Sequence, residues 1–190
     1  MIGKKNIVFG FLYLVLTAAL GPTMIVKYSD TVTAAESAKQ QKVGKLQQAV
    51  QDGFEVDLEP MTPEQIAKLN SAAILALSAL INSEAPIDAI KGGPHTHGNL
   101  EAVLNILVGF LLCFLAIHPM FKQLISWTFI IGAVMHSGLL FLAVALELPW
   151  AGALLAGPVG YIGPILILLG LLLAGVAALL GFRGSIETDY

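Results

Sequence analysis

Histidine, carboxylate and amide side chains gather at the beginning of one apolar segment, residues 94–117, which reads PHTHGNLEAVLNILVGFLLCFLAI. Two histidines, His95 and His97, lie one residue apart at its start. If the segment is helical, side chains four residues apart share one face. Turning such a face toward lipid would cost several kcal/mol for the unpaired polar groups. This face is therefore predicted to point into a helix bundle. It carries His97, Glu101, Asn105, Gly109 and Cys113.

This combination of side chains is typical of a transition-metal site. Glu147 ends a later apolar segment at the membrane face where His95 and His97 are expected. Neutral imidazole is a common protein ligand of zinc, copper and iron, and carboxylates complete many such sites. The predicted metal ligands are therefore His95, His97, Glu101 and Glu147. The alternative is two solvated histidines beside a glycine-rich turn, with Glu101 and Asn99 stabilising a helix N-terminus through its dipole.

A third histidine, His136, lies in the middle of the apolar segment 124–146. Ionisable residues within a membrane span are rare, and they usually face the protein interior and serve a function. We predict that His97, His136 and Asn105 bind a cofactor. The alternative is a neutral imidazole, hydrogen-bonded to Asn105 or Ser137, that only fixes helix packing.

The depths of the histidines decide which cofactor geometry is expected. At about 1.5 Å per residue, His97 and His136 should lie roughly 10–15 Å apart along the membrane normal. Two axial ligands of one haem iron must lie at nearly the same depth. The spacing therefore favours a deep ligand, His136, with a separate outer pair, His95 and His97, or a second axial ligand from a partner subunit.

The elements that must position these residues are membrane-spanning helices. The chain has 190 residues, of which 56% are hydrophobic and 12% are charged, whereas soluble domains have about 25% charged residues. A helix of about 20 apolar residues crosses a bilayer. Such runs occur at residues 7–26, 98–117, 124–146 and 157–182. The predicted fold class is all-α: an integral membrane four-helix bundle with a mostly helical extracytoplasmic loop between the first and second spans.

The domain boundaries follow from these spans. Residues 1–26 are predicted to form an N-terminal transmembrane anchor, 27–94 an extracytoplasmic helical region, 95–184 a three-span bundle and 185–190 a cytoplasmic tail. A cleaved signal peptide is the alternative for the first span, but its apolar run exceeds the about 7–15 residues usual there. The last span has a ridge of small residues that would let another helix approach closely: Gly170, Ala174, Ala177 and Gly181.

The hydrophilic block between the first two spans has its own signals. A surface helix over 29–52 and a short extended piece at 54–59 are expected first. Thr62 is then a good N-cap, and Gln65 can complete a capping box. Pro86 and the turn at 92–94 are expected to end the block. One apolar stripe is predicted on the second helix: Ile66, Leu69, Ala73, Ile74, Leu77, Leu80 and Ile81.

Charge predicts the orientation and excludes some function classes. If the spans alternate, one side of the membrane carries Lys4, Lys5, Lys122 and Arg183. The positive-inside rule then predicts that both termini lie in the cytoplasm. The expected membrane is a bacterial inner membrane. The net charge of −3 gives no reason to expect a nucleic-acid partner. With one cysteine and no triad, phosphate-binding loop or CxxCH pattern, the sequence does not support a hydrolase or nucleotide enzyme of the soluble type.

Three of the apolar segments resemble those of small bacterial membrane proteins: FGFLYLVLTAALGPTM, HTHGNLEAVLNILVGFLL and WTFIIGAVMHSGLL. The pattern is also similar to the histidine-bearing helices of the subunit I superfamily of haem–copper oxidases. This resemblance implies haem b or copper binding by His95, His97 and His136, and a place in respiratory or nitric-oxide-related redox chemistry. Four spans rather than twelve, and Ala102 where the oxidase motif has glycine, exclude a complete oxidase site.

These observations predict a membrane protein that binds haem b or a transition metal (copper, iron or zinc) near its outer face. We expect an accessory or electron-transfer subunit of a redox complex rather than a stand-alone enzyme. Its expected partners are the lipid bilayer and other membrane subunits or further copies of itself. The alternatives are a cofactor-free structural or assembly subunit and a pathway for a small solute or protons.

Overall fold

The computed structural model describes residues 1–183, and almost all of this part of the chain is helical. Four helices within it are long and apolar enough to cross a membrane. The chain divides into two compact units. Among the described residues, the first consists of 1–22 and 89–183, and the second of 23–88. The predicted cytoplasmic tail, residues 185–190, lies outside the described residues.

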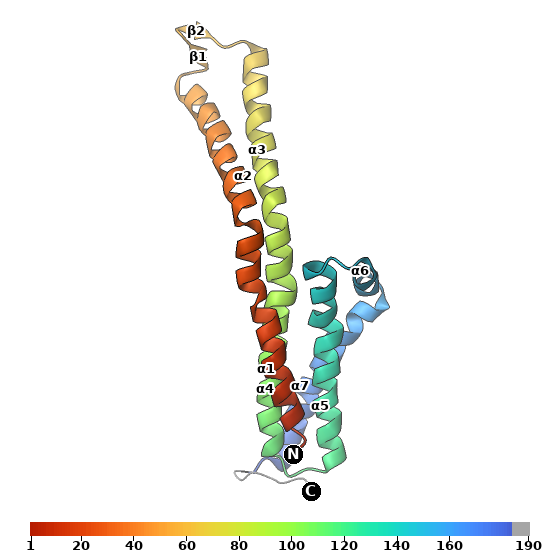
Figure 1. Cartoon of the computed structure of the whole chain (residues 1–190). Helices are drawn as coiled ribbons and strands as arrows, with labels where there is room; N and C mark the ends of the chain where they lie inside the picture. The colour runs from red at the N-terminus through yellow and green to blue at the C-terminus, as the bar shows by residue number, and fades with distance from the viewer. Residues whose placement is uncertain (184–190) are drawn as a thin grey trace. The chain divides into compact units, whose positions relative to one another are not determined.

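The first unit is a bundle in which α1 packs along α4, α5 packs along α7, and α4 contacts α5 (Figure 1). Irregular helical turns extend α5 and precede α7, because backbone hydrogen bonds of the π or 3₁₀ type replace the α pattern there. The helices of this unit are α1 (Lys4–Ala18), η1 (Lys91–His95), α4 (Thr96–Cys113), α5 (Pro119–Ala133), η2 (Val134–Gly138), η3 (Phe141–Ala145), α6 (Pro149–Ala156), η4 (Pro158–Tyr161) and α7 (Ile162–Gly181).

Small residues bring α1 and α4 into close contact. A Cβ atom added at Gly10 would lie 2.6 Å from the carbonyl oxygen of Ala102, and one added at Gly109 would lie 2.5 Å from a side-chain carbon of Ile7. At the other end, a Cβ atom at Gly98 would overlap the Thr17 side chain. Backbones this close exclude larger side chains, as is typical of packed membrane helices.

The predicted small-residue ridge of the last span is confirmed. All four of its residues are buried in α7, and a Cβ atom at Gly170 would lie 2.9 Å from the Phe129 ring on α5. The hydrophobic core lies beside this contact, where α4, α5 and α7 meet. It consists of Val108, Leu112, Leu115, Ile125, Phe129, Ile167, Ala174 and Ala177.

The connection between α4 and α5 differs from the expected end of the second span at residue 117. The helix ends at Cys113, and the next begins at Pro119 with His118 as its N-cap. Backbone hydrogen bonds join the connection to the end of α7: the Ala116 N–H donates to the Gly181 carbonyl at 2.7 Å, and the Arg183 N–H donates to the Phe114 carbonyl at 3.0 Å. The end of α7 is thereby fixed to the turn between the second and third spans.

No loop separates the hydrophilic block from the second span, which corrects the helix end expected at Pro86. Helix α3 (Pro63–Ile90) continues through Pro86 instead of ending there. A π-helical turn, η1 (Lys91–His95), then leads directly into α4. The change of direction is confined to Gly93, whose φ of −96° and ψ of −107° are non-helical. Glycine permits this conformation, and the residue before a proline is disfavoured in the α region.

The second unit is a helical hairpin. Helix α2 (Leu20–Gln51) and α3 lie side by side, joined by a two-stranded sheet of β1 (Glu55–Val56) and β2 (Glu59–Pro60) (Figure 1). The predicted capping box is confirmed, because the Thr62 N–H donates to Gln65 Oε1 at 2.7 Å and the Gln65 N–H to Thr62 Oγ1 at 3.2 Å.

The apolar stripe predicted on α3 does not behave as one surface. Ala73 and Leu80 are buried, whereas Ile74, Leu77 and Ile81 are exposed. The buried positions are seven residues apart, which keeps them on one side of a helix. Leu77 lies four residues from Ala73 and three from Leu80, so the exposed positions border the buried ones and only part of the predicted stripe is covered.

Candidate functional site

A group of hydrogen-bonded polar side chains surrounds His136, which lies on the π-helical turn η2 at the end of α5. Such turns contain one extra residue and often occur at functional sites. The opposite helix is very close, because a Cβ atom at Gly163 would lie 2.5 Å from the His136 backbone nitrogen. This contact between α7 and η2 fixes the backbone that carries the imidazole.

The imidazole of His136 is hydrogen-bonded to a buried carboxylate. Its Nδ1 atom lies 2.5 Å from Oε1 of Glu101. The Glu101 side chain is 5% exposed and the His136 side chain is 20% exposed. A carboxylate accepts hydrogen bonds, so Nδ1 carries the donated proton and Nε2 is the nitrogen that remains to bind a ligand.

Two hydroxyl groups continue the hydrogen bonding from Glu101 to the first helix. The Ser137 hydroxyl donates to Oε2 of Glu101, and it lies 2.7 Å from the Tyr13 hydroxyl oxygen. Both Tyr13 and Ser137 are buried. Residues from α1, α4 and η2 are therefore joined in one buried network.

His97 also belongs to this site, which corrects the predicted depths. Its ring centroid lies 4.8 Å from that of His136, with an angle of 58° between the ring planes. The expected separation of roughly 10–15 Å assumed that the second span begins at residue 98 and rises by about 1.5 Å per residue. Helical structure begins before that position, so His97 lies within the helical bundle and level with His136.

The other predicted ligands are not brought to this pair. His95 Nδ1 donates to the Thr17 carbonyl at 2.9 Å, and Glu147 lies at the end of the third span with a positive φ of 54°. Within residues 1–183, no three histidine, cysteine, aspartate or glutamate side chains are arranged to hold a metal ion. The four-residue ligand set His95, His97, Glu101 and Glu147 is therefore not formed as one group.

Asn105 belongs to a second buried network instead of contacting His136. Its Oδ1 atom accepts a hydrogen bond of 3.0 Å from Asn6 on α1, and its amide donates to the Phe129 carbonyl at 3.4 Å. Ser126 donates to Asn6 Oδ1, and Asn6 donates to the Ser126 carbonyl at 3.1 Å. These bonds tie α1, α4 and α5 together and use the polar atoms of Asn105.

The polar residues of the first helix were missed by the sequence analysis. Asn6, Tyr13 and Thr17 are all buried, and each bonds to another part of the first unit. A signal was present, because these positions and Gly10 are three or four residues apart and so share one face of a helix.

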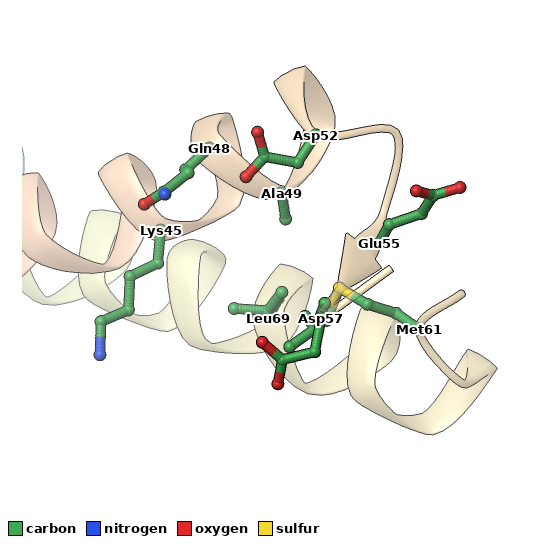
Figure 2. A pocket seen from close by; sticks show the side chains of 9 residues that line it. Lys45, Gln48, Ala49, Asp52, Glu55, Asp57, Met61 and Leu69 are labelled. Atoms are coloured by element: carbon green, nitrogen blue, oxygen red, sulfur yellow. The ribbon is translucent and has the colours of Figure 1, made fainter. Parts of the chain in front are cut away.

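A separate pocket of about 430 Å³ lies near the tip of the second unit (Figure 2). It combines an apolar floor, which includes Ala49 and Leu69, with carboxylates around it. In Figure 2 the carboxylates of Asp52, Glu55 and Asp57 point in different directions and do not converge on one point. This pocket therefore lacks the convergent polar groups that define a binding site.

No protein-family model, curated protein or solved structure matches this chain.

Proposed function

We propose that this protein is an integral membrane protein that binds one transition-metal ion through His97 and His136, as a non-catalytic or redox accessory subunit. The observation that supports the proposal is the hydrogen bond from His136 Nδ1 to the Glu101 carboxylate. A metal-bound histidine almost always donates its other ring N–H to such a partner, which orients the ring and makes its free nitrogen a better ligand.

The distance between the two rings fits a single ion. Metal–imidazole bonds of about 2.0–2.1 Å place each ring centre roughly 3 Å from the metal. A centroid separation of 4.8 Å then corresponds to an angle of roughly 100° at the ion, close to tetrahedral. Two protein ligands leave positions for a water molecule, a substrate or a ligand from a partner. Imidazole ligands suit copper and zinc, and the resemblance to oxidase helices favours copper.

The same distance does not fit a haem iron between these histidines. Two axial imidazoles lie on opposite sides of the porphyrin, which separates their ring centres by roughly 6 Å at ordinary metal–nitrogen distances. The observed separation of 4.8 Å and the angle of 58° between the planes leave no room for the macrocycle. A haem clamped by His97 and His136 is therefore not proposed.

Metal titration of the purified protein in detergent tests the proposal. We expect wild-type protein to bind about one copper(I) or zinc ion per chain in competition with a chromogenic chelator. His97→Gln and His136→Gln should each abolish this binding. His95→Gln is the matched control, since His95 is bonded to Thr17, and it should bind like wild type.

Three outcomes would contradict the proposal: no stoichiometric metal in the wild-type protein, equal binding in the His136→Gln variant, or equal loss in the His95→Gln variant. The first outcome would favour the cofactor-free structural role. That role has support of its own, because within residues 1–183 every buried side-chain nitrogen and oxygen atom has a hydrogen-bond partner. A visible spectrum on the same samples detects haem directly.

A further inference from the structure

The hydrogen bonds around Glu101 have a defined direction. Glu101 accepts from His136 Nδ1 and from the Ser137 hydroxyl. A serine hydroxyl has one proton to donate. Because Ser137 gives that proton to the carboxylate, it must accept the hydrogen bond of 2.7 Å that it shares with Tyr13. Tyr13 therefore donates a hydrogen bond to Ser137, and Ser137 donates one to Glu101. His136 donates the second hydrogen bond that Glu101 accepts.

We infer that Tyr13, on the first helix, is a positioning residue for the His136 imidazole and acts through Ser137 and Glu101. Its hydroxyl fixes the orientation of the Ser137 hydroxyl, which holds the carboxylate that selects Nδ1–H on His136. The ring then presents Nε2 as the ligand nitrogen. This inference rests on the proposed function, in which that nitrogen binds the metal.

Ser137 needs Tyr13 because a second acceptor is within reach. The Ala133 carbonyl lies 3.3 Å from Ser137 Oγ, so the serine proton can turn away from Glu101. A hydrogen bond donated to the serine oxygen strengthens the bond that the serine donates in turn, because hydrogen bonds in a chain polarise one another. The tyrosine hydroxyl thereby favours the orientation toward the carboxylate.

The Tyr13 ring is itself held in place. It stacks on Phe9 with a centroid distance of 5.1 Å and an angle of 18°. An open crevice of about 310 Å³ is lined by Tyr13 and by apolar residues that include Phe9, Leu139 and Leu142. Apart from Ser137, the protein acceptor near the hydroxyl is the Ala133 carbonyl at 3.5 Å. The phenol is therefore directed at Ser137.

Removing single hydroxyl groups tests the inference. Tyr13→Phe keeps the ring and its stacking, and Ser137→Ala breaks the chain next to Glu101. Nitrogen-15 spectra of histidine-labelled, metal-free protein report which ring nitrogen carries the proton. The His136 signal is the one that is missing from the spectrum of the His136→Gln variant. We expect the Nδ1–H form in wild type and a substantial Nε2–H population in both variants. Metal affinity should fall roughly tenfold, as for other residues that orient a ligand.

The double variant separates positioning from a general loss of packing. If Tyr13 acts only through Ser137, then Tyr13→Phe has no further effect on tautomer or affinity in the Ser137→Ala background. Tyr161→Phe is the matched control, because Tyr161 is 72% exposed, and it should resemble wild type.

Three results would each overturn the inference. They are additive effects in the double variant, an unchanged His136 spectrum in Tyr13→Phe, and a wild-type His136 ring that carries its proton on Nε2. The nitrogen-15 spectra need no metal. They therefore decide the inference even where titration shows that wild-type protein binds none, which would overturn the proposed function instead.

Discussion

Glu101 is the residue on which the candidate site depends, because a buried carboxylate needs donors on both of its oxygens. His136 and Ser137 supply one each. This arrangement explains why an acidic residue is found on the face of α4 that also carries the small residues packed against α1. The carboxylate links helix packing to the orientation of the imidazole.

Replacing Glu101 with glutamine should therefore weaken metal binding. The amide keeps the shape of the side chain, but its NH₂ group cannot accept the hydrogen bond from Ser137. We expect metal affinity to fall about 10–100-fold, measured by chelator competition. Glu84→Gln, at an exposed position of α3, is the control and should bind as wild type does. Unaltered affinity in Glu101→Gln would show that the carboxylate does not orient His136.

Asn6 should contribute to stability and not to the metal site. It makes three hydrogen bonds with Asn105 and Ser126, and bonds between membrane helices are worth on average about 0.6 kcal/mol each. We expect Asn6→Leu to lower the free energy of unfolding by about 2 kcal/mol, measured by titration with a denaturing detergent, with metal affinity unchanged. Asn70→Leu, at an exposed position, should have no such effect; equal destabilisation would contradict a role for the network.

At the level of residues, the sequence predicted the participants of the site better than their pairing. His97, Glu101 and His136 stood out because polar residues are rare in apolar spans. Their contacts could not be predicted, since spacing along one helix does not specify the axial offset of the next. Asn105 shares the face of Glu101 yet bonds to Asn6 and Phe129 instead of His136.

Among the elements, the close approach of α7 to η2 sets the position of His136. Gly163→Ala would place a methyl group 2.5 Å from the His136 backbone nitrogen, so one of the two segments must shift. We expect a loss of about 1–3 kcal/mol in the free energy of unfolding and weaker metal binding. Gly175→Ala on the same helix meets no atom within 4 Å. It should be neutral or stabilising, because alanine favours helix over glycine; similar losses in both would disprove the specific contact.

The element boundaries that the sequence misplaced share one physical cause. Glycine and proline at positions 86 and 92–94 predicted an end to the helix, but a kink at Gly93 allows the chain to remain helical on both sides. Local propensity indicates where a helix can bend. It does not distinguish a bend from a loop, because that choice depends on packing such as the His95 and Asn99 contacts with Thr17.

For the whole molecule, composition predicted the mostly helical fold and its four apolar helices, because apolar runs of this length are a strong signal. It could not predict that one of the expected basic side chains, Lys122, is 1% exposed. The start of α1 and the end of α7 lie at the same end of the first unit, as Gly3 approaches Gly109 and Arg183 bonds to Phe114. The side of the membrane on which they lie stays a prediction.

Cysteine labelling tests that orientation. Cys113→Ala removes the native cysteine, and single cysteines are then introduced as Ser37→Cys or Met120→Cys. Ser37 lies in the second unit and Met120 at the start of α5, and both positions are exposed. The positive-inside rule predicts that a membrane-impermeant maleimide labels Ser37→Cys on intact spheroplasts, and labels Met120→Cys only after lysis. The reverse pattern would invert the topology, and labelling of both positions before lysis would argue against a membrane-spanning bundle.

The π-helical turn that carries His136 has a consequence for how this protein can vary in length. An α-helix turns by about 100° for each residue. A π-helical turn absorbs one extra residue without passing that rotation on to the rest of the helix. Deleting one residue between positions 134 and 138 would therefore let the turn relax to α-helix and move the side chains within η2, including His136, away from their present partners. A deletion in the tight turn at Asp57 and Leu58 would shorten only a hairpin at the surface. Changes in length are therefore expected to accumulate at the hairpin tip and to be eliminated at η2.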